Sequence, residues 1–267
     1  MNQTAPPTTI GSSSTRPQAR NPKTSRRRPQ NPALSNGGRI LNILDLDAVA
    51  METLAEHARR FGFASVTAVP ITETIKRLKD HFGDEVGTNV WLAVFGNADS
   101  VLPACRDIVS EFNMPEGWSL SYLACPNDAQ VEQIAALSLA CGVAPSPTYY
   151  IRSEVFPHLT ACLWDETGAL AAIAAASQRY HPDSRFGDTA FAGSVAVSPD
   201  RRRMGLGRFI NAAILLESQS AFGWQRVLEQ ARADNAASRG MIRACGLSED
   251  LDLGTIAVNL TGEFLTR

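Results

Sequence analysis

The stretch that decides the fold covers residues 193–211 and reads GSVAVSPDRRRMGLGRFIN. Small and β-branched residues at 194–197 favour a strand, and residues 198–200 have the composition of a turn. Apolar residues then recur at helical spacing, at positions 209, 210, 213, 214 and 216. The stretch therefore predicts a strand, a tight turn and a helix in direct succession, and the other elements are expected to pack around it.

Two glycines and a run of arginines mark the predicted start of this helix. Gly205 and Gly207 leave the backbone amides bare, so that a ligand can approach closely. Unpaired N–H groups at a helix start carry partial positive charge, and four side chains add full charges beside them: Arg201, Arg202, Arg203 and Arg208. A phosphate or pyrophosphate site is predicted, with an exposed basic turn as the alternative. The stretch lacks the Lys-Ser/Thr of a Walker loop and the third glycine of a dinucleotide fingerprint.

Residues 202–207, Arg-Arg-Met-Gly-Leu-Gly, resemble the acetyl-CoA signature of the GCN5-related N-acetyltransferases (GNAT). That signature has Arg or Gln, two free positions, Gly, one free position, and Gly or Ala. A second block resembles the family's later pattern, with Asn235, a small residue at Ser238, an apolar residue at Met241 and Gly-Leu at 246–247. The resemblance covers residues 118–267.

The resemblance implies a fold and a cofactor. The fold is α/β (α+β), with a mixed, mainly antiparallel sheet that splays between its fourth and fifth strands and is flanked by helices. Acetyl-CoA is the implied cosubstrate, and no metal is expected. Its pantetheine arm is assigned to Val195, Ala196 and Val197. Its pyrophosphate is assigned to Arg202, Arg203, Met204, Gly205, Leu206, Gly207 and Arg208, with Asn235 and Ser238 nearby.

The usual acid and base of the family are both replaced. Many relatives have Tyr seven residues after the motif Asn, where this chain has Ile242. Some relatives have Glu five residues before the Asn, where this chain has Gln230. Glu229 is one residue away from that position. Successive side chains of a strand face opposite sides, so Glu229 could act as the base only if a bulge in the strand turned its side chain to the other face. Glu229 and Asp188 are the catalytic candidates, each with a solvated surface acid as the alternative.

The implied reaction is transfer of an acetyl group to a primary amine of a small molecule or peptide. Tyr149 and Tyr150 lie in an irregular segment, 143–156, that in the resemblance covers the acceptor site, so both are substrate candidates. Two alternatives stay open: a catalytically degenerate CoA-binding module, and transfer of a longer acyl group.

Composition divides the 267 residues into three parts. Residues 1–38 carry basic residues but no acidic one and are rich in Pro and Ser, which predicts a disordered tail; a transit peptide is opposed by the scattered prolines. Residues 39–117 are predicted to form a small α/β domain of unknown function, with a decayed half-acetyltransferase as the alternative. Residues 118–267 form the predicted acetyltransferase domain.

Periodicity places the elements. In the middle part, strands are expected at 40–44, 64–69 and 89–95 and helices at 47–61, 71–82 and 99–112. In the last part, strands are expected at 118–125, 159–164, 169–177, 224–231 and 253–260. One helix is expected to begin at a cap formed by Asn127 and to end near 141–142, and a second helix is expected at 236–244.

The remaining observations concern location and partners. The five cysteines are widely spaced, which favours a reducing compartment and no metal site. The sequence has no long apolar run, and the acidic balance outside the tail disfavours nucleic acid. A cytoplasmic protein that binds neither nucleic acid nor membrane is expected, and a homodimer is left open.

Overall fold

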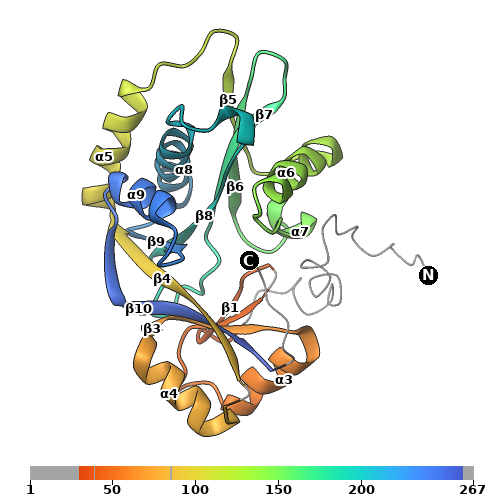
Figure 1. Cartoon of the computed structure of the whole chain (residues 1–267), viewed down its shortest axis with the longest axis vertical. Coiled ribbons are helices and arrows are strands. Elements are labelled where there is room, and N and C mark those ends of the chain that lie inside the picture. The colour runs from red at the N-terminus through yellow and green to blue at the C-terminus, as the bar shows by residue number, and fades with distance from the viewer. Residues whose placement is uncertain (1–29, 39, 85, 261–267) are drawn as a thin grey trace, which may run out of the picture.

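The computed structural model describes residues 30–38, 40–84 and 86–260. Its described strands form one ten-stranded sheet in the order β1-β2-β3-β10-β4-β9-β8-β7-β6-β5 (Figure 1). The strands are β1 Leu34–Asn36, β2 Leu41–Ile43, β3 Ala64–Pro70, β4 Gly87–Asn97, β5 Ser119–Leu123, β6 His158–Trp164, β7 Leu170–Ser177, β8 Thr189–Val197, β9 Arg226–Ala231 and β10 Ser248–Asn259. Neighbouring strands are antiparallel except for β2–β3 and β8–β9, which are parallel.

Helices cover the sheet. They are α3 Met51–Phe61, α4 Ile71–Phe82, α5 Ala98–Glu111, α6 Asp128–Ala140, α7 Thr148–Ile151, α8 Leu206–Phe222 and α9 Ala236–Ala244, with a 3-10 turn at Pro199–Arg201. In Figure 1, α5, α8 and α9 lie on one side of strands β6 to β8 and α6 and α7 on the other. The helices α3 and α4 pack at the far end, against β3 and β10. The expected mixed, mainly antiparallel sheet with flanking helices is confirmed.

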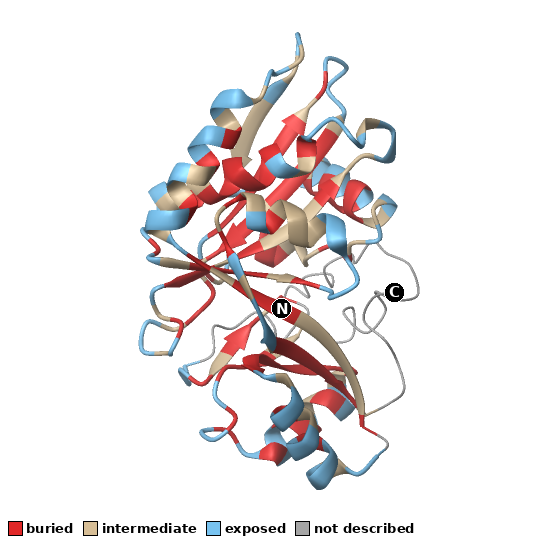
Figure 2. Ribbon diagram, turned by 60° about the vertical axis from the view of Figure 1, so that its left-hand side comes forward, coloured by how far each residue is buried: buried red, intermediate tan, exposed pale blue. Residues whose placement is uncertain are grey.

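Two apolar clusters hold the layers together. The larger joins α5 and α8 to strands β6 to β9, and its fully buried members include Ile210, Ile214 and Val227. The second joins α3 and α4 to β3 and β10 through Leu54, Leu78 and similar side chains. Figure 2 shows these buried stripes facing the sheet while the outer helix faces are exposed. Burial of one stripe per helix is what the 3.6-residue spacing predicts.

The sheet runs across the predicted domain boundary at residue 117. Strand β4, which comes from the middle part, lies between β9 and β10 of the last part and pairs antiparallel with both. Strand β10 also pairs with β3. Strands from the two predicted domains therefore alternate in one sheet, and the division at 117 stays a prediction about folding units.

The predicted strand and helix types are confirmed, while several boundaries were wrong. Helix α3 begins at Met51 rather than at 47, because the Asp45 side chain accepts hydrogen bonds from the N–H groups of Asp47 and Ala48 and forms a turn there. Strand β10 begins earlier than 253, with a register shift against β4 between Glu249 and Gly254. The short helix α7 lies inside the segment expected to be irregular.

The predicted disordered tail was wrong for its last residues. Residues 34–36 form β1, which pairs with β2 so that Leu34 lies opposite Ile43. The hairpin is possible because Gly38 takes a left-handed conformation, with φ of 78°. Residues 1–29 lie outside the described part of the chain.

Candidate functional site

The central feature of the site is the separation of β8 from β9. The two strands pair only from Thr189 opposite Arg226 to Phe191 opposite Leu228. Beyond Phe191 the edge of β8 is no longer paired with β9, although β8 continues to Val197. Backbone groups that leave a ladder need other partners, so this edge can bond a ligand.

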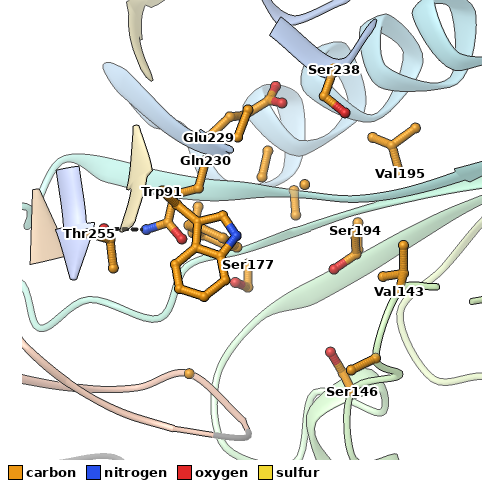
Figure 3. A pocket seen from close by; sticks show the side chains of 18 of the residues that line it. Trp91, Val143, Ser146, Ser177, Ser194, Val195, Glu229, Gln230, Ser238 and Thr255 are labelled. Carbon is orange, nitrogen blue, oxygen red and sulfur yellow. Dashed lines mark hydrogen bonds between the residues drawn. The ribbon is translucent and has the colours of Figure 1, made fainter. Parts of the chain in front are cut away.

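A bulge lies where β8 leaves its neighbour. On the other side, β7 pairs Ile173 with Ala196 and Ala175 with Gly193, so that one residue of β7 faces both Ser194 and Val195. Ser194 has a φ of 54°, which is unusual for a residue with a side chain. A bulge takes a residue out of the ladder and re-aims its backbone and side chain. Figure 3 shows Ser194 and Val195 extending to opposite sides of β8.

A cavity of about 510 Å³ occupies the gap, a volume within the usual range for small-molecule sites. It is lined by the β8 bulge, by residues 229–231 of β9, by residues 141–144 after α6, and by Ser238, Met241 and Ile242 of α9. At its other end the lining comes from β2, β3, β4 and β10, through Asn42, Ser65, Trp91 and Thr255. The cavity therefore joins the two predicted domains.

The start of α8 adjoins this gap. Gly205 caps the helix in a left-handed conformation with φ of 79°, and no side chain caps its first turn. The first N–H groups of a helix have no intrahelical acceptor. A Cβ placed on Gly207 would lie 3.7 Å from Cγ2 of Val197 and 3.6 Å from Sδ of Met241. The first turn of α8 therefore lies next to both the end of β8 and α9.

The arginines around this turn differ in their partners. Arg201 pairs with Asp165, with Nη2 and Oδ2 3.2 Å apart. Arg202, Arg203 and Arg208 are exposed and form no ion pair with a described residue. Met204 is also exposed, whereas Leu206 is buried and anchors the helix. Three cations are thus available to an anionic ligand at the start of α8.

The other predicted cofactor residues contribute in different ways. The Ala196 side chain is buried among the residues of a cluster under α6, so only its backbone can contact a ligand. The carbonyl oxygen of Val197 accepts a hydrogen bond from the Cys141 thiol, at 3.1 Å. Asn235 caps α9 by accepting a hydrogen bond from the N–H of Ser238, at 3.0 Å, and both residues line the cavity.

Comparison with known proteins identifies the family. Residues 131–247 match the model of the Acetyltransferase (GNAT) family. A GCN5-related N-acetyltransferase from Kribbella flavida superposes with a TM-score of 0.54 at 12% identity, over 85% of this chain and 84% of that one. A tandem GNAT protein from the clavulanic acid biosynthesis pathway gives 0.55 at 14% identity, over 84% and 75%. Residues 131–247 therefore form a GNAT-family segment, and the chain as a whole has a GNAT-like fold.

Two further comparisons complete the assignment. A GCN5-related N-acetyltransferase-like protein from Streptococcus suis gives a TM-score of 0.52 at 13% identity, over 82% of this chain and 78% of that one. No curated protein matches the sequence. Because the structural likeness covers over four fifths of the chain, it extends into residues that precede the GNAT segment. The expectation of a decayed half-acetyltransferase there stays a prediction.

Glu229 and Gln230 face opposite sides of β9. The register of β9 against β4 is regular from Arg226 to Ala231, so no bulge turns Glu229 around. Its carboxyl group lies on the helix side, as Figure 3 shows, and accepts a hydrogen bond from Nδ2 of Asn211 at 2.9 Å. Burial raises the pKa of Glu229 to about 7, although the hydrogen bond from Asn211 opposes this.

Gln230 extends to the other side, toward Trp91 (Figure 3). Its Nε2 donates a hydrogen bond to Oγ1 of Thr255, at 2.6 Å. Ile242 is buried, lines the cavity and has no proton to give. Neither Gln230 nor Ile242 therefore offers an acid or a base to the gap.

Asp188 lies away from the cavity. It precedes β8 and forms an ion pair with Arg226, with Oδ1 and Nη2 2.8 Å apart. That guanidinium holds the pKa of the Asp188 carboxyl below its usual value. An acid so paired is a poor proton acceptor, and it does not line the cavity.

Only one of the two predicted substrate residues lines the cavity. Tyr150 lines the cavity, and its hydroxyl lies 3.1 Å from Oγ of Ser177. Tyr149 does not line it and donates a hydrogen bond to the carbonyl oxygen of Gly38, at 2.9 Å. Sequence reasoning missed the lining residues Asn42, Ser65, Trp91, Arg179 and Thr255. Their only signal was a polar or aromatic side chain within a predicted strand or loop.

Other features bear on the functional class. The described residues contain no group of three or more His, Cys, Asp or Glu side chains that could hold a metal ion. Within the same residues, no helix has the length and apolar character to cross a membrane.

Proposed function

We propose that this GNAT chain binds acetyl-CoA between β8 and β9 and transfers the acetyl group to a primary amine of a small molecule or peptide. One observation carries the proposal: the first turn of α8 lies next to the end of β8 and next to Met241, which lines the cavity. Gly207 links them, because the position of its missing Cβ contacts Val197 of β8 and Met241 of α9. A long ligand with an anionic end fits such a path.

The residues fit the parts of the cosubstrate. The unpaired edge of β8, from residue 192 onward, can hydrogen-bond the amides of a pantetheine arm. The first turn of α8 offers free N–H groups, and Arg202, Arg203 and Arg208 add positive charge for the pyrophosphate. Asn235 and Ser238 line the wall formed by α9.

Acetyl-CoA supplies a thioester whose carbonyl carbon an amine attacks. We assign stabilisation of the resulting negative oxygen to backbone N–H groups of the β8 bulge. The attacking amine must be unprotonated. Glu229 faces the helices and Asp188 lies outside the cavity, so neither carboxylate is assigned as the base. We assign most of the rate to the positioning of the two reactants in the gap.

A CoA-binding module without turnover is the second candidate. The observations that favour it are Ile242 and Gln230, which stand where relatives have an acid and a base. Positioning alone can sustain transfer between a thioester and an amine, and for that reason activity is preferred.

Release of CoA thiol should be followed with acetyl-CoA and a panel of primary amines and peptides. Turnover of at least one amine is expected. Tight binding of acetyl-CoA without turnover of any amine or peptide would favour the second candidate instead. Competition between acetyl-CoA and longer acyl-CoAs in the same assay identifies the acyl group.

A further inference from the structure

A buried arginine lines the cavity two residues after Ser177. Arg179 follows β7, lines the cavity and is only 6% exposed. Its guanidinium carbon lies 3.6 Å from the ring centroid of Phe191, another lining residue. Stacking on an aromatic face holds the planar guanidinium in one orientation.

The charge of Arg179 has no counter-ion. Among the described residues, no carboxylate lies within ion-pair distance of it. Its Nε has no hydrogen-bond partner there, and its Nη2 donates a long hydrogen bond, 3.4 Å, to the hydroxyl of Tyr180. The guanidinium also interacts with the hydroxyl of Tyr150, which is a neutral group. A buried cation is normally paired with an anion.

A second unpaired donor lines the same cavity. Asn42 of β2 is 3% exposed, and its Oδ1 accepts a hydrogen bond from Oγ of Ser65 at 2.6 Å. This leaves the Nδ2 group, which has no partner among the described residues. Buried polar groups without partners are rare in folded proteins and are costly. Two unpaired donors that line the same cavity indicate an acceptor-rich ligand.

The rest of the lining is compatible with an anion. Glu229 is the one carboxylate among the described lining residues, and it lies on the helix side of β9. His158 lines the cavity near Tyr150, and burial lowers its pKa to about 3, so its imidazole is neutral at physiological pH. No negative group therefore stands opposite Arg179 within the described lining.

We propose that Arg179 and Asn42 bind a carboxylate carried by the amine acceptor. A guanidinium matches a carboxylate with two parallel hydrogen bonds, which gives both affinity and orientation. The inference rests on the proposed function, because it names the class of acceptor: an amine that also bears a carboxylate. The carboxylate is held at one end of the cavity, and the amine points toward the β8 bulge.

The strand gives an upper limit for the spacing of the two groups. Phe191, which stacks on Arg179, and Val195, which lies in the bulge, are four residues apart on β8. At about 3.3 Å per residue, this separation is at most roughly 13 Å. The proposal places the two groups along this span and therefore favours an acceptor with an extended spacer, such as a long ω-amino acid, over an α-amino acid.

The test compares acceptors that differ only at the carboxylate. Acetyl transfer from acetyl-CoA is measured with 6-aminohexanoate, its neutral amide 6-aminohexanamide, and 6-aminohexyl phosphate. A preference of roughly tenfold or more in kcat/KM for the carboxylate over the amide is expected, in line with a charged hydrogen bond. Along the series glycine, 4-aminobutyrate, 6-aminohexanoate and 8-aminooctanoate, the longer acceptors should be favoured. Equal rates for carboxylate and amide, or preference for the phosphate, would overturn the assignment.

The variant Arg179→Met keeps an apolar side chain of similar length in the buried site. It should raise KM for 6-aminohexanoate much more than KM for the neutral amide, so that the preference for the carboxylate is lost. Arg106→Met, on the exposed face of α5, is the control and should change neither. A retained carboxylate preference in Arg179→Met would contradict the proposal.

A binding measurement separates this proposal from the proposed function. Hexanoate alone is titrated into the wild type and into Arg179→Met by calorimetry, with no need for turnover. Binding that is lost in the variant supports the carboxylate site even where no amine is acetylated. Absence of hexanoate and 6-aminohexanoate binding to a wild type that does acetylate amines would refute the site and leave the reaction intact.

Discussion

Replacing Glu229 with Gln should change how stability depends on pH. The carboxyl group is 1% exposed and has one hydrogen bond, from Nδ2 of Asn211. Oδ1 of Asn211 is buried and has no partner among the described residues. In Glu229→Gln the new amide has the same size, accepts the same hydrogen bond, and has an N–H that can donate to Oδ1 of Asn211. We therefore expect the variant to fold.

The magnitude follows from the pKa of Glu229. Burial raises it from 4.5 to about 7 in the folded protein. Folding thus favours the neutral carboxyl group. The contribution of this group to the free energy of unfolding is fully present below pH 4.5, where the group is neutral in both the folded and the unfolded state. It is lost as the pH rises through about 7. At about 1.4 kcal/mol per tenfold change in proton affinity, the loss is about 3 kcal/mol. Glu229→Gln should not show this loss.

The assay is urea unfolding of both proteins at a series of pH values from 5 to 9. The free energy of unfolding of Glu229→Gln minus that of the wild type should rise with pH and level off above pH 8. Using the difference cancels the other titrating groups, among them Asp188 and Glu249, whose pKa values are lowered by arginine partners. Glu132→Gln, at an exposed position of α6, serves as the control. A difference that is independent of pH would refute this account of the buried carboxyl group.

The same variant tests the catalytic role once predicted for Glu229. Because the carboxyl group faces the helices, Glu229→Gln should keep acetyl transfer within a few-fold of the wild type. A loss of about a hundredfold or more, typical of a removed general base, would show that Glu229 takes the proton.

Two further predictions concern α6 and its end. Asn127 and Gln130 form a reciprocal cap, in which each side chain accepts a hydrogen bond from the backbone N–H of the other at 2.9 Å. Asn127→Ala should therefore lower the free energy of unfolding, measured by urea titration, by about 1 kcal/mol. An unchanged urea midpoint would contradict the stabilising role of the cap. Cys141 lines the cavity, so acetyl-CoA should slow its alkylation in a Cys125→Ser background, measured by mass spectrometry; an equal rate with and without acetyl-CoA would contradict the placement of the ligand.

Local sequence signals were sufficient for most elements of the fold. Asn127 was predicted as a helix cap, and the structure confirms its capping hydrogen bonds. Helix α4 covers the predicted residues 71–82, because its apolar residues recur at helical spacing up to Gly83, which ends it. Signals of this kind depend on neighbours within a few residues.

Pairing between distant segments could not be predicted in the same way. Nothing in the residues of β4 indicates that it lies between β9 and β10, because that place depends on contacts more than 100 residues apart in sequence. Arg179 was missed because it follows β7 and stacks on Phe191 of β8, and no local pattern in the sequence marks that contact. Tyr149 and Tyr150 are adjacent in sequence, yet only Tyr150 lines the cavity, because neighbouring side chains point in different directions.

The central claim is that acetyl-CoA lies along β8 with its pyrophosphate at the start of α8. Calorimetric titration of acetyl-CoA into the wild type, Gly207→Ala and Gly207→Leu tests it most directly. A Cβ at this position meets only ordinary contacts, at 3.6 and 3.7 Å, so Gly207→Ala should fold and bind within about tenfold of the wild type, a change of about 1.4 kcal/mol. The longer side chain of Gly207→Leu should fill the space beside Val197 and Met241 and abolish binding. Unchanged affinity in Gly207→Leu, or no heat of binding to the wild type, would contradict the claim.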